Sequence, residues 1–233
     1  MSTLNLPQSL ENLIPKDEAS QEALRHAVAH LAQPILHHSL RVYFYAHALA
    51  TQPRYRDNEP SLAQFSDPAR LPLVLVAAAL HDIGTCAAHD GPQRFEVEGA
   101  DHAERHLLAH GYGYEDAHRV WVAVAVHSSP GIAERIDPLA RLIRAAVKID
   151  FTKTWQDEYG TAELTAELEA ALPRLGAEKC LADLVVGQAR ERPDRLDART
   201  YWESQKHPGG SWPGGLLRAA VENPGYEGVN PAF

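Results

Sequence analysis

The chain has 233 residues, of which 45% are hydrophobic, and its formal net charge is −9 at pH 7. This length and apolar content predict one globular domain with a sizeable core. The acidic balance argues against broad binding to nucleic acids or to anionic membranes. Two cysteines cannot form a disulfide framework, so we expect a reducing compartment.

The N-terminal segment lacks the charged start and the long apolar stretch of a signal peptide. The apolar run over residues 71–80 is too short to span a bilayer and is typical of a buried helix. We therefore expect a cytoplasmic protein that acts on a small molecule, with neither a nucleic-acid nor a membrane partner.

Most segments show helical periodicity, and none alternates as a strand would. The expected helices cover residues 16–31, 34–51, 72–83, 96–111, 115–127, 138–150, 162–172 and 177–190. The stretch 53–70 is polar and contains three prolines, so we expect a loop there. Asp137 and Pro138 form a strong helix start, because the carboxylate can cap the helix and proline is tolerated in its first turn.

These elements predict an all-α bundle over residues 1–192, with its motif core at 34–151. Residues 193–233 are rich in glycine and proline. We expect an irregular tail that packs on the domain through its aromatic residues Trp202, Trp212 and Tyr226. This tail could also form an interface between copies of the chain, which would make a homo-oligomer.

Ionisable residues stand on three of the apolar helical stretches. His38 shares a face with Val42 and Tyr45, so it points into the core. His81 and Asp82 end a helix that is apolar nearly all round. An aspartate is unfavourable at the C-terminal end of a helix, so Asp82 needs a cation nearby.

A fourth such residue, Asp150, closes the helix that begins at Pro138. Ordinary interpretations exist as well: His38 could be a core histidine, and Asp150 could pair with Lys148 or Lys153. An ion pair is the alternative for Asp82 too, but no basic residue is near it in the sequence. Buried together, they would instead satisfy one another through a shared metal ion. Two imidazoles and two carboxylates suit Zn, Fe, Mn or Ni better than Ca or Mg.

The order of these residues resembles that of the HD-domain superfamily of metal-dependent enzymes, which is a family of helical bundles. Within it, the stretches HSLRVYFYAHAL, LVAAALHDIGTC, RFEVEGADHAERHL and AVHSSPGI resemble the cyanamide hydratase group. The resemblance implies one divalent metal ion, usually Zn, held by His38, His81, Asp82 and Asp150. It also implies hydration of cyanamide, a small nitrile, to urea.

Three more residues are candidates for contact with the substrate. Glu96 stands where two-metal HD enzymes commonly hold a further histidine, so it favours a single metal and could orient water or move protons. His127 could protonate a developing nitrile nitrogen. Thr85 could hydrogen-bond to the substrate or to a ligand. The ordinary alternatives are a capping glutamate, a core histidine and a threonine that ends a helix.

Other functions remain open on the sequence alone. A metal-dependent HD-type phosphohydrolase acting on a nucleotide or another phosphomonoester would use the same ligands and would need a cation for phosphate, such as Arg41, Arg94 or Lys148. A non-catalytic, metal-stabilised binding module and a di-iron oxygenase are further alternatives. Cys86 near the metal pair admits a thiolate nucleophile.

The remaining histidines fall in rows with helical spacing. His102, His106 and His110 form one row, and His26 and His30 form another. We interpret both rows as solvated helix faces, because no carboxylate arrangement accompanies them.

Overall fold

The computed structural model describes residues 6–56, 60–191 and 212–225, and these residues form helices and turns without a β-strand. In chain order the elements are α1 (Gln8–Glu11), α2 (Glu18–His30), α3 (Gln33–Thr51), α4 (Pro53–Arg56), η1 (Pro60–Ser66), α5 (Leu71–Leu80), η2 (Ile83–Thr85), η3 (Ala87–His89), α6 (Phe95–Ala109), α7 (Tyr114–Val126), α8 (Ala133–Ile136), α9 (Pro138–Phe151), α10 (Lys153–Tyr159), α11 (Ala162–Ala171), α12 (Ala177–Glu191) and α13 (Trp212–Glu222). The predicted all-α class is confirmed.

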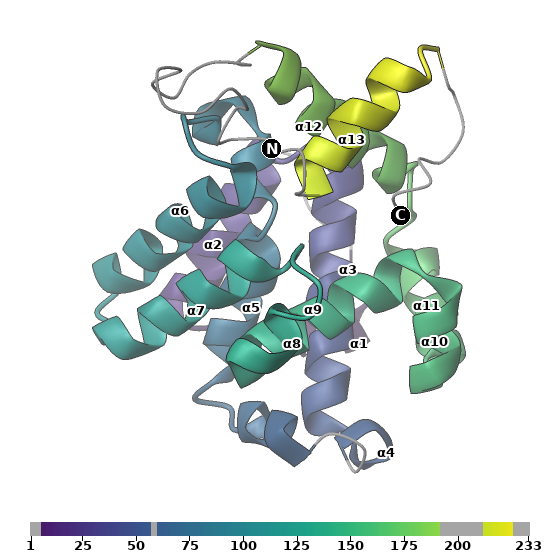
Figure 1. The fold of residues 1–233 in the computed structure, drawn as a ribbon. Coiled ribbons are helices and arrows are strands. Elements are labelled where there is room, and N and C mark those ends of the chain that lie inside the picture. Colours follow the sequence, from purple (N-terminus) through teal and green to yellow (C-terminus); the bar gives the residue numbers. More distant parts are fainter. Residues whose placement is uncertain (1–5, 57–59, 192–211, 226–233) are drawn as a thin grey trace.

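Helix α3 is the central element of the bundle (Figure 1). It packs against α5 and α9, while α7 packs against both of those helices as well as α6. Most of its residues are buried, because helices surround it on several sides. The charged and polar side chains that α3 carries are therefore placed in the interior, where they need partners.

Helix α5 is buried along its whole length, as its uniformly apolar sequence LPLVLVAAAL predicts. The predicted start of α9 is also confirmed, since Asp137 Oδ1 accepts a hydrogen bond of 2.7 Å from the Leu139 backbone N–H. Both helices pack on α3, and the ionisable residues at their C-terminal ends contact the first half of that helix.

Two expectations about loops are wrong. The stretch 53–70 contains α4 and η1, because Tyr55, Leu62 and Phe65 are apolar residues that bury against the core. Within the supposedly irregular tail, residues 212–222 form α13, which packs on α12 and buries Leu216. Averaged over the whole tail, the glycine and proline content conceals this short apolar segment. Trp202 and Tyr226 lie outside the described residues.

Trp212 is partly buried, and its ring centroid lies 6.2 Å from that of Phe95 at the start of α6. Helix α13 thus covers the end of the bundle where α6 begins. Among the described helices, none is both long and apolar enough to cross a membrane.

Candidate metal centre

The turn after α5 places His81 and Asp82 side by side in the core. His81 Nδ1 lies 2.8 Å from the Ala78 carbonyl oxygen, which can only accept, so this nitrogen carries a proton. In the neutral imidazole the Nε2 lone pair is then free to bind a metal. Both side chains are fully buried, so the position of Asp82 brings a carboxylate into an apolar interior.

His38 enters the same space from α3. Its Nδ1 donates to Asp150 Oδ2 at 2.7 Å, which leaves its Nε2 only 3.1 Å from His81 Nε2. The Phe151 ring stacks on the His38 ring, with centroids 4.4 Å apart, and further fixes its orientation. The Nε2 atoms of two imidazoles therefore face one point, where a cation or a shared proton between them would satisfy both.

The carboxylate of Asp82 completes this group. Its Oδ2 lies 3.1 Å from His81 Nε2 and 3.7 Å from His38 Nε2, and the three residues can each place one ligand atom within 4.8 Å of the others. Neither Asp82 oxygen has a hydrogen-bond partner within the described part of the chain, although both are buried. A buried carboxylate without such partners is costly. A divalent metal ion bound by Asp82 would remove this cost. The three residues His38, His81 and Asp82 are therefore a suitable ligand set for such an ion.

Asp150 lies beside this group and is held from two sides. Arg41 donates to both of its oxygens, through Nε at 2.7 Å and Nη2 at 2.8 Å, while His38 occupies Oδ2 as well. The structure thus joins Asp150 to the centre through His38. Its direct ligation of a metal stays a prediction.

The charges at the centre follow from this arrangement. Burial lowers the pKa of His38 even though Asp150 opposes the shift. Burial alone would raise the pKa of Asp82, but His81 and His127 hold it well below its ordinary value. In the same way, Arg41 and His38 outweigh burial and lower the pKa of Asp150. Ionised carboxylates and a neutral imidazole are the forms in which these groups bind metals.

His127, the residue that ends α7, faces Asp82. Its Nδ1 donates to the Val124 carbonyl at 2.6 Å, and its Nε2 lies 3.5 Å from Asp82 Oδ1. The rings of His81 and His127 meet edge to face, with centroids 4.8 Å apart. His127 is therefore in contact with the centre through its Nε2.

Glu96 is fully buried in the first turn of α6 and belongs to a neighbouring network. Arg94 Nη2 donates to its Oε1 at 2.6 Å, and the Ser128 hydroxyl donates to the same oxygen. Because Ser128 directly follows His127, Glu96 is connected to the centre through this turn. Sequence reasoning missed Ser128, although its position beside a candidate histidine was a usable signal.

Thr85 closes the turn that carries Asp82. Its hydroxyl donates to the Asp82 carbonyl at 2.7 Å. This contact agrees with the ordinary alternative, in which Thr85 ends the helix. Thr85 also lines a hollow of about 620 Å³ between this turn and α12, together with Ala87, Cys180 and Gln188. Gln188 Nε2 donates to the Gly84 carbonyl at 2.8 Å and joins α12 to the turn. A contact between Thr85 and a substrate stays a prediction.

Gly84 allows the turn to pass against α6. A Cβ atom there would lie 2.1 Å from the Phe95 carbonyl oxygen, which belongs to a fixed helix start. We expect Gly84→Ala to destabilise the protein by roughly 1–3 kcal/mol or more, because backbone has to move. A matched control is Gly187→Ala in α12, where the added atom meets open space and should stabilise by about 0.5–1 kcal/mol. Urea unfolding measures both; shifts of the same sign would contradict this interpretation.

Two arginines near the centre are engaged by the protein itself. Arg41 is fully buried, binds Asp150 and donates to the Leu172 carbonyl at 2.8 Å. Arg94 pairs with Glu96. Two of the three candidates for holding a phosphate group, Arg41 and Arg94, therefore already donate to acceptors within the protein.

Comparison with known proteins agrees with this geometry. The HD domain family model matches residues 35–151, which are about half of the chain and include His38, His81, Asp82 and Asp150. A search of curated proteins gave no match. With this match and a buried His38, His81 and Asp82 cluster of the kind that binds a divalent metal ion, the chain belongs to the HD domain family.

Proposed function

We propose that this protein is a metal-dependent hydratase that adds water to a small nitrile, with cyanamide as substrate and urea as product. The proposal takes its substrate from the resemblance of four sequence stretches to the cyanamide hydratase group. It takes its support in the structure from the burial of the centre.

The observation that carries the proposal is the burial of the centre. The side chains of His38, His81 and Asp82 are fully buried, and His127 is only 4% exposed. A nucleotide brings a large base and a charged phosphate that calls for arginine or lysine contacts. The buried Arg41 is already bound by Asp150, so a small neutral substrate suits the centre better.

The reaction joins the oxygen of water to the nitrile carbon and gives a proton to the nitrile nitrogen, which leads to the amide. When bound, a divalent metal ion supplies Lewis acidity that makes water a nucleophile at neutral pH. His38, His81 and Asp82 would hold this ion, and Asp150 would either join them as a fourth ligand or orient His38. His127 Nε2 would carry the proton to the nitrogen. Glu96 would keep the His127–Ser128 turn in place or pass a proton through it.

A substitution of His127 separates proton transfer from metal binding. We expect His127→Asn to lower kcat by about 100-fold or more, because general acid catalysis is lost. The metal content should stay at the wild-type level, since His38, His81 and Asp82 are intact. Loss of the metal together with the activity would instead place His127 among the ligands.

The decisive assay uses purified, metal-loaded full chain with cyanamide and a panel of small nitriles, followed by detection of urea or the amide. The same preparation is tested for phosphate release from nucleotides. Turnover of a nitrile supports the proposal. Phosphate release that falls in Lys148→Ala would support the phosphohydrolase instead. A protein without turnover whose melting temperature still depends on metal would support a binding module.

Two further measurements separate the remaining alternatives. Metal analysis giving two irons per chain would favour a di-iron oxygenase. Burial raises the pKa of the Cys86 thiol, which disfavours a thiolate nucleophile. Cys86→Ser should therefore keep nitrile turnover, and its loss would favour the thiolate.

A further inference from the structure

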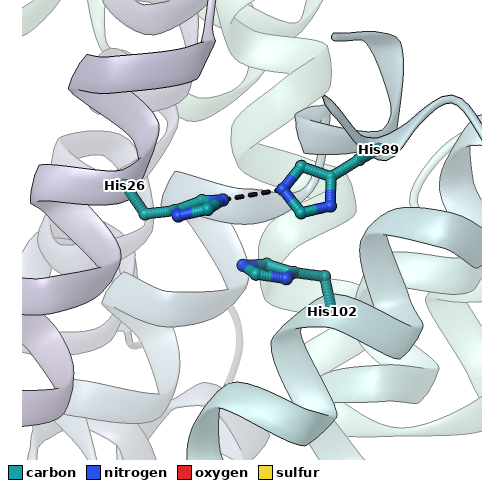
Figure 2. A group of neighbouring side chains, drawn as sticks. All are labelled: His26, His89 and His102. Atoms are coloured by element: carbon teal, nitrogen blue, oxygen red, sulfur yellow. Dashed lines mark hydrogen bonds between the residues drawn. The ribbon is translucent and has the colours of Figure 1, made fainter. Parts of the chain in front are cut away.

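Three histidines from separate elements converge at a second place in the molecule. His26 comes from α2, His89 ends η3 and His102 lies on α6 (Figure 2). His26 Nε2 lies 2.7 Å from His89 Nε2, and the His102 ring is 4.4 Å from the His26 ring and 4.2 Å from the His89 ring, measured between centroids. The three can each offer one nitrogen within 4.8 Å of the others.

This arrangement corrects the interpretation of His26 and His102 as residues of solvated helix faces. His26, His89 and His102 are all partly buried. His102 Nε2 is buried and has no hydrogen-bond partner among the described residues. Elsewhere in its row, His106 Nε2 contacts the Ala19 carbonyl at 2.8 Å and His110 pairs with Glu22, so those two histidines have ordinary partners. In this row, the nitrogen without a partner is therefore Nε2 of His102, the histidine that belongs to the cluster.

The cluster is a set of neutral bases. Burial, together with the neighbouring imidazoles, lowers the pKa of His26 to about 4 and that of His102 to about 3. Burial likewise lowers the pKa of His89. The nearby charge of Arg105 lowers this pKa further, whereas the charge of Glu98 raises it. Three neutral imidazoles therefore place several nitrogen lone pairs in a small volume. At most one hydrogen bond, between His26 and His89, joins two of them.

We propose that His26, His89 and His102 bind one transition-metal ion, in a site separate from the HD centre. An all-imidazole set suits Zn²⁺, Co²⁺, Ni²⁺ or Cu²⁺, and it disfavours Mg²⁺ and Ca²⁺, which prefer oxygen ligands. Ligand nitrogens about 2.0–2.1 Å from a tetrahedral ion are about 3.3 Å apart. Opening the 2.7 Å contact between His26 and His89 to that distance requires only a small side-chain movement. A fourth position would be left for solvent.

The position of His89 gives this site a structural role. η3 follows η2 directly, and Thr85 and Ala87 in this segment line the hollow beside the HD centre. An ion bound by His26, His89 and His102 would fasten η3 to α2 and α6. It would thereby fix one wall of the hollow, whichever reaction the protein catalyses.

The test compares four forms of the full chain, made without a histidine tag: wild type, His89→Gln, Asp82→Asn and the double variant. Each is stripped with a chelator, given excess Zn²⁺, desalted and analysed for bound zinc. We expect His89→Gln to remove one zinc ion per chain from wild type and also from Asp82→Asn. Added zinc should raise the melting temperature of Asp82→Asn but not that of the double variant.

The matched control is His118→Gln, because His118 lies on α7 and pairs with Glu104 outside the cluster. This variant should keep the zinc content of wild type. His102→Asn is a second test of the site, because it removes the Nε2 atom that has no partner. This atom comes from α6, whereas His89 belongs to η3. Equal zinc content in wild type, His89→Gln and His102→Asn, with helical circular dichroism preserved, would overturn the proposal.

Discussion

Asp82→Asn is expected to abolish catalysis and to weaken metal binding at the HD centre by more than about 100-fold. Removal of a residue that only supports a ligand already costs about 10–100-fold in metal affinity, and Asp82 is the carboxylate within the ligand group itself. Asparagine has nearly the same shape, so the α5 end and the η2 turn should keep their conformation. The change therefore removes the charge and leaves the fold in place.

Two measurements check this result on the metal-stripped protein. Isothermal titration with Zn²⁺ should lose its tightest phase, and turnover should fall to background. The matched control is Asp157→Asn, an exposed aspartate that pairs with Lys153 on α10. This control should match wild type in both assays. An Asp82→Asn protein that still binds metal tightly and still turns over would remove Asp82 from the centre.

The buried cluster of His38, His81 and Asp82 could be predicted from the sequence because each member leaves a local signal. His38 interrupts an apolar face, and His81 and Asp82 end a helix that has no polar face at all. Such positions are costly unless the residues share a partner, and this argument needs only helical periodicity. The structure brings His38, His81 and Asp82 together as that argument requires.

The partners of Asp150 could not be predicted in the same way. Arg41 stands three residues after His38, so both side chains lie on one side of α3. The sequence shows this proximity but not the pairing of Arg41 with Asp150, which is 109 residues away. From the sequence, Arg41 is only a candidate contact for phosphate, because nothing in its local sequence indicates that a carboxylate already binds it.

The histidine cluster shows the same limit in another form. Spacing within one helix groups His102 with His106 and His110, whereas the structure groups His102 with His26 and His89. Each of these three comes from a different element, and His89 ends a short turn with no periodicity. Their convergence depends on how α2 and α6 pack beside η3, which helical patterns alone do not specify.

Arg41→Met is expected to lower the free energy of unfolding by about 3–5 kcal/mol, since it leaves a buried carboxylate without its main cation. Arg41 and Asp150 are both fully buried and are joined by two hydrogen bonds. Methionine fills much of the same volume, so the loss reflects charge more than packing. Urea unfolding of the metal-stripped protein at neutral pH measures the effect, and Lys153→Met at an exposed pair should cost only about 0–1 kcal/mol.

The sign of the pH dependence provides a further check. Arg41 and His38 hold the pKa of Asp150 below its ordinary value, so the pair stabilises the fold above about pH 4. This contribution is lost as the pH falls below that point toward the lowered pKa. The stability difference between wild type and Arg41→Met should therefore shrink on acidification.

The double variant Arg41→Met/Asp150→Leu should recover part of the loss at neutral pH, because no buried charge is left unpaired. A loss in Arg41→Met that neither acid nor the second substitution reduces would assign Arg41 a packing role in place of an electrostatic one.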